Sequence, residues 1–197
     1  MLTRVVILGL IGAGKGTQAV RVAEERDIVH ISTGDMFRAA ATAGTELGLR
    51  ARGYMERGEL VPDQVTIDML LERISEPDAE GGFILDGFPR TGGQAEALER
   101  ALAERGLGVD VVTRIEVPQE VLLDRIAKRA DLEGRTDDRP EVAAERLRVQ
   151  RTGIEDVARF YGARGVLVVV DGVGSVDEVA ARLSEALDRV SPRVETA

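Results

Sequence analysis

With 197 residues, of which 44% are hydrophobic and 31% charged, the chain is expected to form one sizeable domain with a buried core. A formal net charge of −9 argues against a nucleic-acid-binding surface, and the absence of cysteine excludes disulfides, thiol nucleophiles and cysteine-ligated zinc. No apolar run reaches the ~20 residues of a membrane span, and the apolar stretch 5–11 leads into a glycine loop rather than a cleavage site, so we expect a cytoplasmic protein.

Hydrophobic patterning and turn residues predict short apolar strands that alternate with helices along the chain. The strands are expected at 4–8, 28–31, 83–85, 111–117 and 166–170. The helices are expected at 17–26, 33–43, 62–75, 94–105, 118–129, 141–161 and 176–190, with a weaker helical stretch between glycines 44 and 58, a polar loop at 131–139 and a tail at 191–197. This order predicts an α/β fold in which helices cover both faces of a five-stranded parallel sheet.

The first predicted strand runs directly into a glycine-rich loop. Residues 9–17 read GLIGAGKGT, which is glycine, four residues, Gly-Lys and then a hydroxyl two positions later. Glycines allow several backbone N–H groups to point into one concavity at the start of a helix, where phosphate binds. Lys15 would reach the β- and γ-phosphates, and the Thr17 hydroxyl would face magnesium. Since Lys15 is one of two lysines in a chain that otherwise uses arginine, this position favours a compact ammonium.

Two other interpretations of this loop are less favourable. A strand–helix turn without a ligand is disfavoured by its position straight after the first buried strand. A dinucleotide-binding turn would need glycine where Thr17 stands and has no use for Lys15. The loop therefore predicts binding of a nucleoside triphosphate, without indicating what is done with it.

Three further motifs follow the loop along the chain. They read STGDMFR at 32–38, GELVPD at 58–63 and GFILDGFPRT at 82–91. In order and spacing they resemble the adenylate kinases, which are nucleoside monophosphate kinases, over nearly the whole chain. The resemblance implies a P-loop kinase fold and reversible, in-line transfer of a phosphoryl group from Mg-ATP to AMP, giving two ADP without a covalent intermediate.

The resemblance also implies an acceptor site for AMP. Thr33, Gly34 and Arg38 would hold the monophosphate, and the Val61 backbone would lie near the base. Arg90 would bind the phosphate as a fork, and Gln94 would read the adenine edge through its amide. The acceptor set implied in this way is Thr33, Gly34, Arg38, Val61, Gly87, Arg90, Gln94, Arg135 and Arg146.

A second group of arginines would line the donor site. Arg125 and Arg129 are one turn apart on a predicted helix and share a face. By the resemblance, Arg125 would lie against the donor adenine, and Asp86 would orient waters around Mg²⁺ near Thr17. The ATP-binding set is Gly12, Ala13, Gly14, Lys15, Gly16, Thr17, Arg125, Arg129 and Gly174. The catalytic set, which would neutralise charge on the phosphates, is Lys15, Arg90, Arg125, Arg129, Arg135 and Arg146.

Two segments within the single domain 1–197 are expected to close over the site before transfer, because water competes with AMP as acceptor. They are the monophosphate-binding segment 32–61 and the loop 131–139, which resembles the short-lid form of the family. Such a lid holds no structural zinc. The family usually has proline where Ile11 stands, so this chain carries an additional N–H in its phosphate loop. His30, in the second strand, is expected to be a packed residue.

Several functions remain open at this stage. A kinase for UMP, CMP or GMP would share the fold, while a nucleotide-binding interaction module would share the loop but has no need of two arginine groups and Asp86. A shikimate-type kinase would not need Thr33, Arg38 and Gln94 together. The expected partners are ATP, AMP and ADP, with no nucleic acid or membrane, and the expected state is a monomer.

Overall fold

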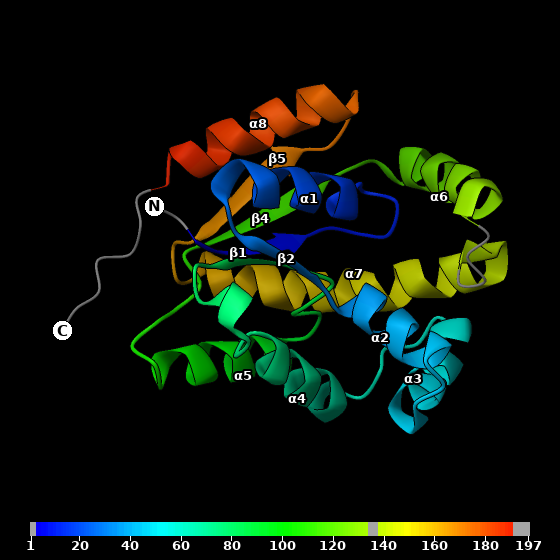
Figure 1. Ribbon diagram of the computed structural model, residues 1–197. Helices are drawn as coiled ribbons and strands as arrows, with labels where there is room; N and C mark the ends of the chain where they lie inside the picture. Colours follow the sequence, from blue (N-terminus) through cyan, green and yellow to red (C-terminus); the bar gives the residue numbers. More distant parts are fainter. Residues whose placement is uncertain (1–2, 134–137, 191–197) are drawn as a thin grey trace.

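The fold is a parallel sheet with helices on both sides (Figure 1). The computed structural model describes residues 3–133 and 138–190, so the expected tail at 191–197 lies outside it. Within those ranges the sheet order is β2-β3-β1-β4-β5, and each neighbouring pair is parallel. Its strands are β1 (Arg4–Leu8), β2 (Val29–Ser32), β3 (Phe83–Asp86), β4 (Val111–Glu116) and β5 (Leu167–Asp171). The predicted α/β fold is confirmed.

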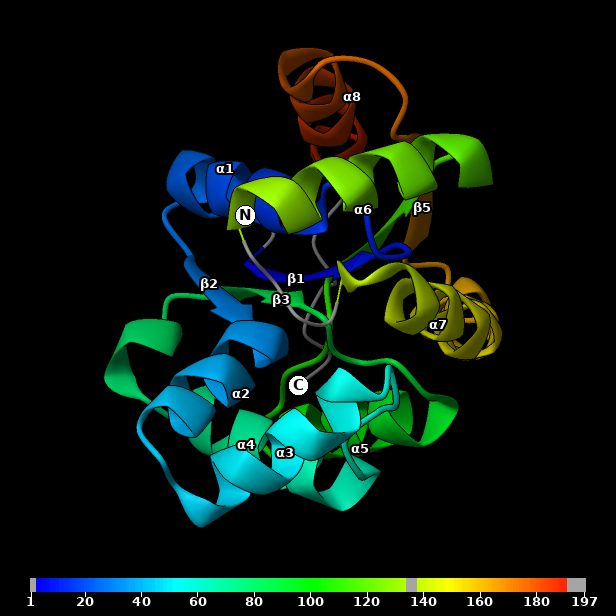
Figure 2. The same cartoon turned by 90° about the vertical axis from the view of Figure 1, so that its right-hand side faces the viewer.

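Helices form the two outer layers, and Figures 1 and 2 show the sheet between them. On one side lie α1 (Lys15–Arg26), α6 (Gln119–Glu133) and α8 (Val176–Asp188). On the other lie α4 (Asp63–Arg73), α5 (Gly92–Ala103) and α7 (Pro140–Gly162), and a short 3₁₀ helix, η1 (Pro77–Ala79), precedes β3. Each layer buries an apolar core against the sheet, the first including Val22, Leu122 and Leu183 and the second Leu70, Leu98 and Tyr161.

Two helices project beside the sheet as a separate segment, α2 (Thr33–Thr42) and α3 (Glu46–Glu56) (Figure 2). They pack closely, since a Cβ added to Gly48 would lie 2.1 Å from the backbone carbon of Ala40. Ser32 caps α2 by accepting a hydrogen bond from the Asp35 N–H, as the serine-acid spacing predicts. Phe37, Ala51 and Val61 form a small core of their own.

Most helix boundaries lie within two residues of expectation, and three of the differences have a clear local cause. Helix α1 begins at Lys15, two residues early, because Gly14 in the left-handed region turns the chain straight into it. Helix α5 begins at Gly92 rather than 94, with Thr91 as its cap. Helix α6 continues to Glu133, three residues into the expected lid loop 131–139, since no glycine or proline occurs from 119 to 133.

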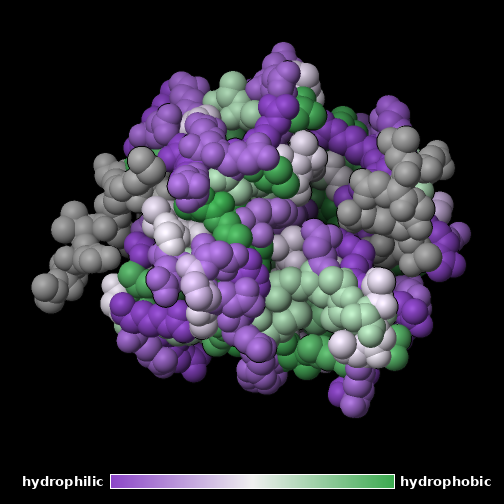
Figure 3. Space-filling view, in the orientation of Figure 1, coloured by the Kyte–Doolittle hydropathy of each residue, from purple (hydrophilic) through white to green (hydrophobic). Residues whose placement is uncertain are grey.

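The surface is mostly polar on the face of Figure 3, where hydrophobic residues occupy smaller areas between hydrophilic ones. This agrees with a chain in which almost a third of the residues are charged. Within 3–133 and 138–190, none of the helices has the length and apolar character needed to cross a bilayer.

Candidate active site

The carboxyl ends of the parallel strands meet at one edge of the sheet, where a cleft of about 680 Å³ opens. Strand β1 leads into the phosphate loop, β3 ends at Asp86, and β5 leads into the turn 172–175. The predicted donor residues all line this cleft: Gly12, Ala13, Gly14, Lys15, Gly16, Thr17, Arg125, Arg129 and Gly174.

The phosphate loop is shaped by two glycines with positive φ, 80° at Gly12 and 87° at Gly14. A Cβ added to Gly12 would lie 2.8 Å from the carbonyl oxygen of Leu122 on α6, so a larger residue would push loop and helix apart. The Ala13 N–H donates to Leu10 O at 3.1 Å, which closes the turn. Helix α1 then begins at the loop, and its N-terminal N–H groups and dipole favour an anion there.

Lys15 and Asp86 form the charged centre of the cleft. Lys15 Nζ donates to Leu10 O at 3.0 Å, within the loop itself. Burial lowers the pKa of Lys15 to about 8, opposed by the nearby Asp86 carboxylate. Arg90, Arg146 and Arg129 lower it further, because they add positive charge around the same amine. The negative charge of a bound polyanion would raise this pKa again and stabilise the ammonium form.

Asp86 keeps its negative charge despite its buried position. Burial alone would raise the pKa of Asp86, but His30, Lys15 and Arg90 outweigh it and hold the pKa below its ordinary value. His30 Nε2 lies 3.9 Å from Asp86 Oδ2. His30 is packed in β2, as expected, but it also lines the cleft, which the sequence analysis did not anticipate. The pairing of β2 with β3 brings it there, and no local pattern signals that contact.

The residues near Thr17 suit a magnesium ion held largely through phosphate and water. Thr17 lines the cleft, and a Cβ added to the neighbouring Gly16 would lie 3.4 Å from Asp86 Oδ2. A hydroxyl and a carboxylate are oxygen ligands of the kind that Mg²⁺ prefers beside a nucleotide. In the part of the chain that the structure describes, no cluster of three or more His, Cys, Asp or Glu side chains could hold a metal by itself.

A second, smaller pocket opens beside the cleft, between the segment α2–α3 and the sheet edge. Of the residues predicted to bind the acceptor, the following line it: Thr33, Gly34, Arg38, Val61, Gly87, Arg90, Gln94 and Arg146. Arg135 lies outside the described residues. Five of these, Gly34, Arg38, Gly87, Arg90 and Arg146, line the donor cleft as well, so the two spaces adjoin through them.

Arg90 and Gln94 are fixed by neighbours before any ligand arrives. Arg90 Nε donates to Gly87 O at 2.7 Å, and the Arg90 N–H donates to Gln94 Oε1 at 2.7 Å. The other end of the Gln94 amide donates to Asp63 Oδ1 at 2.8 Å, while Thr91 Oγ1 donates to Asp63 Oδ2 at 2.7 Å. Gln94 is buried, with one N–H and one lone pair of its amide beyond these two bonds. The sequence analysis did not assign Asp63, which closes the motif 58–63.

Asp138 joins two of the predicted catalytic arginines across helices α6 and α7. Arg129 forms two bonds to its carboxylate, from Nε at 2.6 Å and from Nη2 at 2.8 Å. Arg146 Nη1 donates to the same group at 2.9 Å. The Asp138 side chain is fully buried, so its charge is compensated within this cluster rather than by water. Its role was missed because only the fold brings 129, 138 and 146 together.

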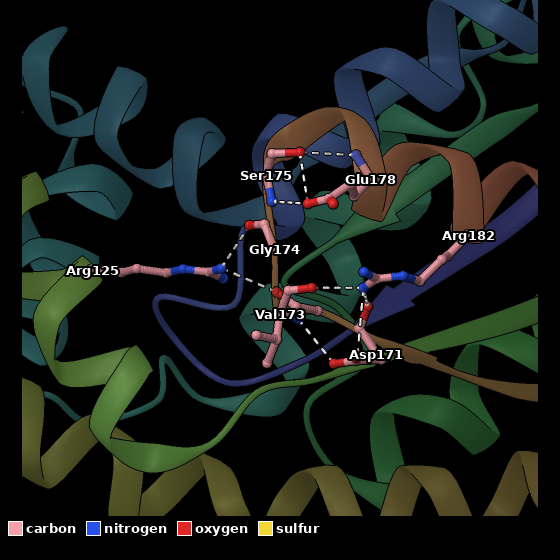
Figure 4. A network of polar contacts seen from close by, with 8 residues as sticks. Arg125, Asp171, Val173, Gly174, Ser175, Glu178 and Arg182 are labelled. Atoms are coloured by element: carbon pink, nitrogen blue, oxygen red, sulfur yellow. Dashed lines mark hydrogen bonds and ion pairs between the residues drawn. The ribbon is translucent and has the colours of Figure 1, made fainter.

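The turn between β5 and α8 borders the donor cleft and is held from two sides (Figure 4). Arg125 Nη2 donates to the carbonyl oxygens of Gly172 at 3.1 Å and Gly174 at 3.5 Å. From the other side, Arg182 Nη1 donates to Asp171 O and Val173 O, both at 2.7 Å. Ser175 and Glu178 form a reciprocal capping box that starts α8. Arg182 was not anticipated, whereas Arg125 and Gly174, both predicted for the donor set, lie in contact.

The sequence is similar to known proteins over most of its length. Residues 7–166 match the family model of adenylate kinase. The chain is 50% identical over 186 residues to the adenylate kinase of Xanthomonas euvesicatoria pv. vesicatoria, covering 94% of this chain and 100% of that one. It is 48% identical over 184 residues to the adenylate kinase of Stenotrophomonas maltophilia strain K279a (93% and 98%). It is 47% identical over 186 residues to that of Micrococcus luteus (94% and 91%). On these matches, the chain belongs to the adenylate kinase family.

Proposed function

We propose that this adenylate kinase transfers a phosphoryl group from Mg-ATP, bound at the phosphate loop, directly to AMP in the pocket beside α2, giving two ADP. The observation that carries the proposal is the shared wall between the two spaces. Arg38, Arg90 and Arg146 line both the donor cleft and the acceptor pocket. A migrating phosphoryl group between the two nucleotides would therefore be surrounded by guanidinium groups, as charge stabilisation in such a transfer requires.

On the donor side, the backbone N–H groups of residues 12–17 and the ammonium of Lys15 bind the β- and γ-phosphates. Arg129 and Arg146, held in place by Asp138, neutralise charge on the transferred group. Arg125 closes the edge of the adenine site together with the turn at Gly174. Mg²⁺, held near Thr17 and by waters oriented on Asp86, supplies positive charge to the phosphates when it is bound.

On the acceptor side, Arg90 offers its guanidinium to the AMP phosphate, with Thr33, Gly34 and Arg38 at the start of α2. Gly87 is needed beside them, because a Cβ there would lie 2.9 Å from Thr33 Oγ1 and 3.0 Å from Arg90 Nη2. Gln94 reads the base with the N–H and lone pair that Arg90 and Asp63 leave available. An amide fixed at both ends discriminates better than a mobile one, since less freedom is lost on binding.

Two parts of the chain close the site. The segment 32–61 carries more than half of the residues that line the acceptor pocket, on a small core of its own, and the lid 131–139 begins within the last turn of α6. Closure excludes water as a competing acceptor and brings donor and acceptor into line. We propose that the enzyme acts as a monomer in the cytoplasm, and the net charge of −9 supports the absence of a nucleic-acid partner.

The test is ATP-dependent phosphorylation of AMP, GMP, CMP and UMP by the purified protein, with and without magnesium. We expect rapid, magnesium-dependent formation of ADP, with AMP far ahead of the other acceptors. Preference for another base would keep the mechanism but overturn the role of Gln94. Binding of ATP without transfer to any acceptor would overturn the proposal and indicate a nucleotide-binding module.

A further inference from the structure

The phosphate loop has a buried contact with a distant helix. The Ile11 N–H donates to the side-chain carbonyl oxygen of Gln150, at 3.1 Å. Both residues are buried, with 4% and 6% of their surface exposed. The bond joins positions 139 residues apart, from the loop after β1 to the middle of α7. The donor exists because isoleucine occupies a position where the family usually has proline, which has no N–H.

An N–H at this depth needs a partner, because a buried donor without one is costly. Gln150 supplies that partner from α7, and it lies one turn after Arg146 on the same face of the helix. The Ile11 side chain belongs to the apolar core that also includes Leu122 of α6 and Leu147 of α7. Backbone and side chain of Ile11 thus both join the loop to the helices that carry the catalytic arginines.

Gln150 also reaches beyond the loop. It lines the acceptor pocket, together with Arg90 and Gln94, and it lines a small space enclosed by Gly9, Lys15 and Phe88. The Gln150 side chain therefore lies between the donor loop and the acceptor pocket. The Gln150 side-chain oxygen accepts the hydrogen bond from the loop, and the same side chain lines the acceptor pocket.

We propose that Gln150 is a positioning residue for the phosphate loop. Its carbonyl oxygen satisfies the N–H that Ile11 introduces and so holds the loop in register with α7 and Arg146. The inference rests on the proposed function in one respect, namely that the loop is the ATP site. Loss of the amide leaves the Ile11 N–H buried without a partner, and the loop shifts to find one, which moves the neighbouring N–H groups and Lys15 away from the phosphates.

The test is a double-substitution cycle on the full chain, comparing the unsubstituted protein, Gln150→Leu, Ile11→Pro and the combination of both. Gln150→Leu keeps the side-chain volume but leaves the Ile11 N–H without an acceptor, and we expect ATP to bind about tenfold more weakly. In the double variant the proline removes the N–H donor, so no buried group lacks a partner, and most of the lost ATP affinity should return. Gln119→Leu is the matched control, because it removes an exposed bond between Gln119 of α6 and Arg151, the neighbour of Gln150 on α7, and should leave ATP affinity unchanged.

ATP binding is measured by calorimetry, alongside kcat, KM for each nucleotide and the melting temperature. If Gln150→Leu lowers the melting temperature but leaves ATP affinity and kcat unchanged, Gln150 is structural only and the proposal fails. Losses that simply add in the double variant would overturn it too. If Gln150→Leu does not fold, Gln150→Asn, whose amide is one methylene too short to reach, must show the same weakening. The proposed function fails by a separate outcome, ATP binding without transfer to AMP in the unsubstituted protein.

Discussion

The donor and acceptor sides of the cleft are built in different ways. The phosphate loop is part of the main core: Ile11 and Ala13 are buried in it, and Gly12 packs against the backbone of α6. The segment α2–α3 instead packs around a small core of Phe37 and Ala51, against which Val65 and Met69 of α4 also lie. The donor phosphates therefore meet a backbone that is already arranged. The acceptor pocket has one wall fixed to the sheet and another carried by the α2–α3 segment, which we propose moves as a unit on closure.

The two sides meet at α7. A Cβ added to Gly58, at the end of the acceptor segment, would lie 2.9 Å from Val142 O and 3.2 Å from Arg146 Cγ. Arg146 lines both spaces, and Gln150 follows it one turn later. Substitutions on the donor side should therefore change ATP binding and turnover. Substitutions on the acceptor side should change KM for AMP. Substitutions at the α6–α7 junction should change all of these at once.

The largest effect is expected on the donor side, from Lys15→Ala. Removal of the ammonium beside the γ-phosphate should lower kcat by about a thousandfold, while the melting temperature changes little. The other lysine of the chain offers a matched control, because Lys128 is exposed and pairs with Asp124 on the same helix. Lys128→Ala should keep near-normal turnover. Steady-state assays on both variants check this, and near-normal turnover of Lys15→Ala would show that Lys15 has no catalytic role.

Asp138→Ala should affect both sides, since Asp138 joins Arg129 of α6 to Arg146 of α7. Without the buried carboxylate the two guanidinium groups repel each other, so we expect the free energy of unfolding to fall by about 3 kcal/mol. Displacement of the arginines should lower kcat by about a hundredfold. Asp124→Ala, which breaks an exposed pair, should cost less than about 1 kcal/mol. Chemical denaturation compares the two variants, and equal losses would contradict a stabilising role for the buried Asp138 cluster.

Much of the fold and of the cleft could be predicted because it is encoded locally. The strands, the alternation of elements and the loop at 9–17 are patterns of neighbouring residues, and the sheet edge then gathers the motifs that follow β1, β2 and β3. Helix α5 begins two residues earlier than expected because Thr91 caps it, and Thr91 is itself bonded to Asp63, 28 residues earlier in the chain. The roles of the predicted residues remain proposals, whereas their positions in the cleft follow from the fold.

Several residues that sequence reasoning missed contact other residues of the site, and we expect them to position those residues. Asp63 orients Gln94 from 31 positions away, and Gln150 meets Ile11 from 139 positions away. Such pairs have no spacing that distinguishes them from surface residues before the chain is folded. The extra N–H at Ile11 was a visible signal, but its partner could be identified only once α7 was packed beside the loop.

Asp63→Ala tests the acceptor side. Loss of the carboxylate frees one end of the Gln94 amide and leaves the Thr91 hydroxyl without its acceptor, so KM for AMP should rise about tenfold. KM for ATP should stay the same, because Asp63 lines no part of the donor cleft. Asp68→Ala is the control on the same helix, since it removes an exposed bond to Gln64. If both Michaelis constants rise together in Asp63→Ala, the acceptor segment is not independent of the donor loop.

The smallest effect concerns the pH dependence of ATP binding. Because burial lowers the pKa of Lys15 to about 8, the amine is mostly charged at pH 7 and mostly neutral at pH 8.5. Phosphates bind the ammonium form, so affinity is greatest below pH 8 and falls as the pH rises through it. The loss of charged enzyme corresponds to about fourfold weaker binding at pH 8.5 than at pH 7, measured by calorimetry with magnesium present. Lys15→Arg keeps its charge across this range and should lack the decline, whereas a decline retained in that variant would assign the titration to another group.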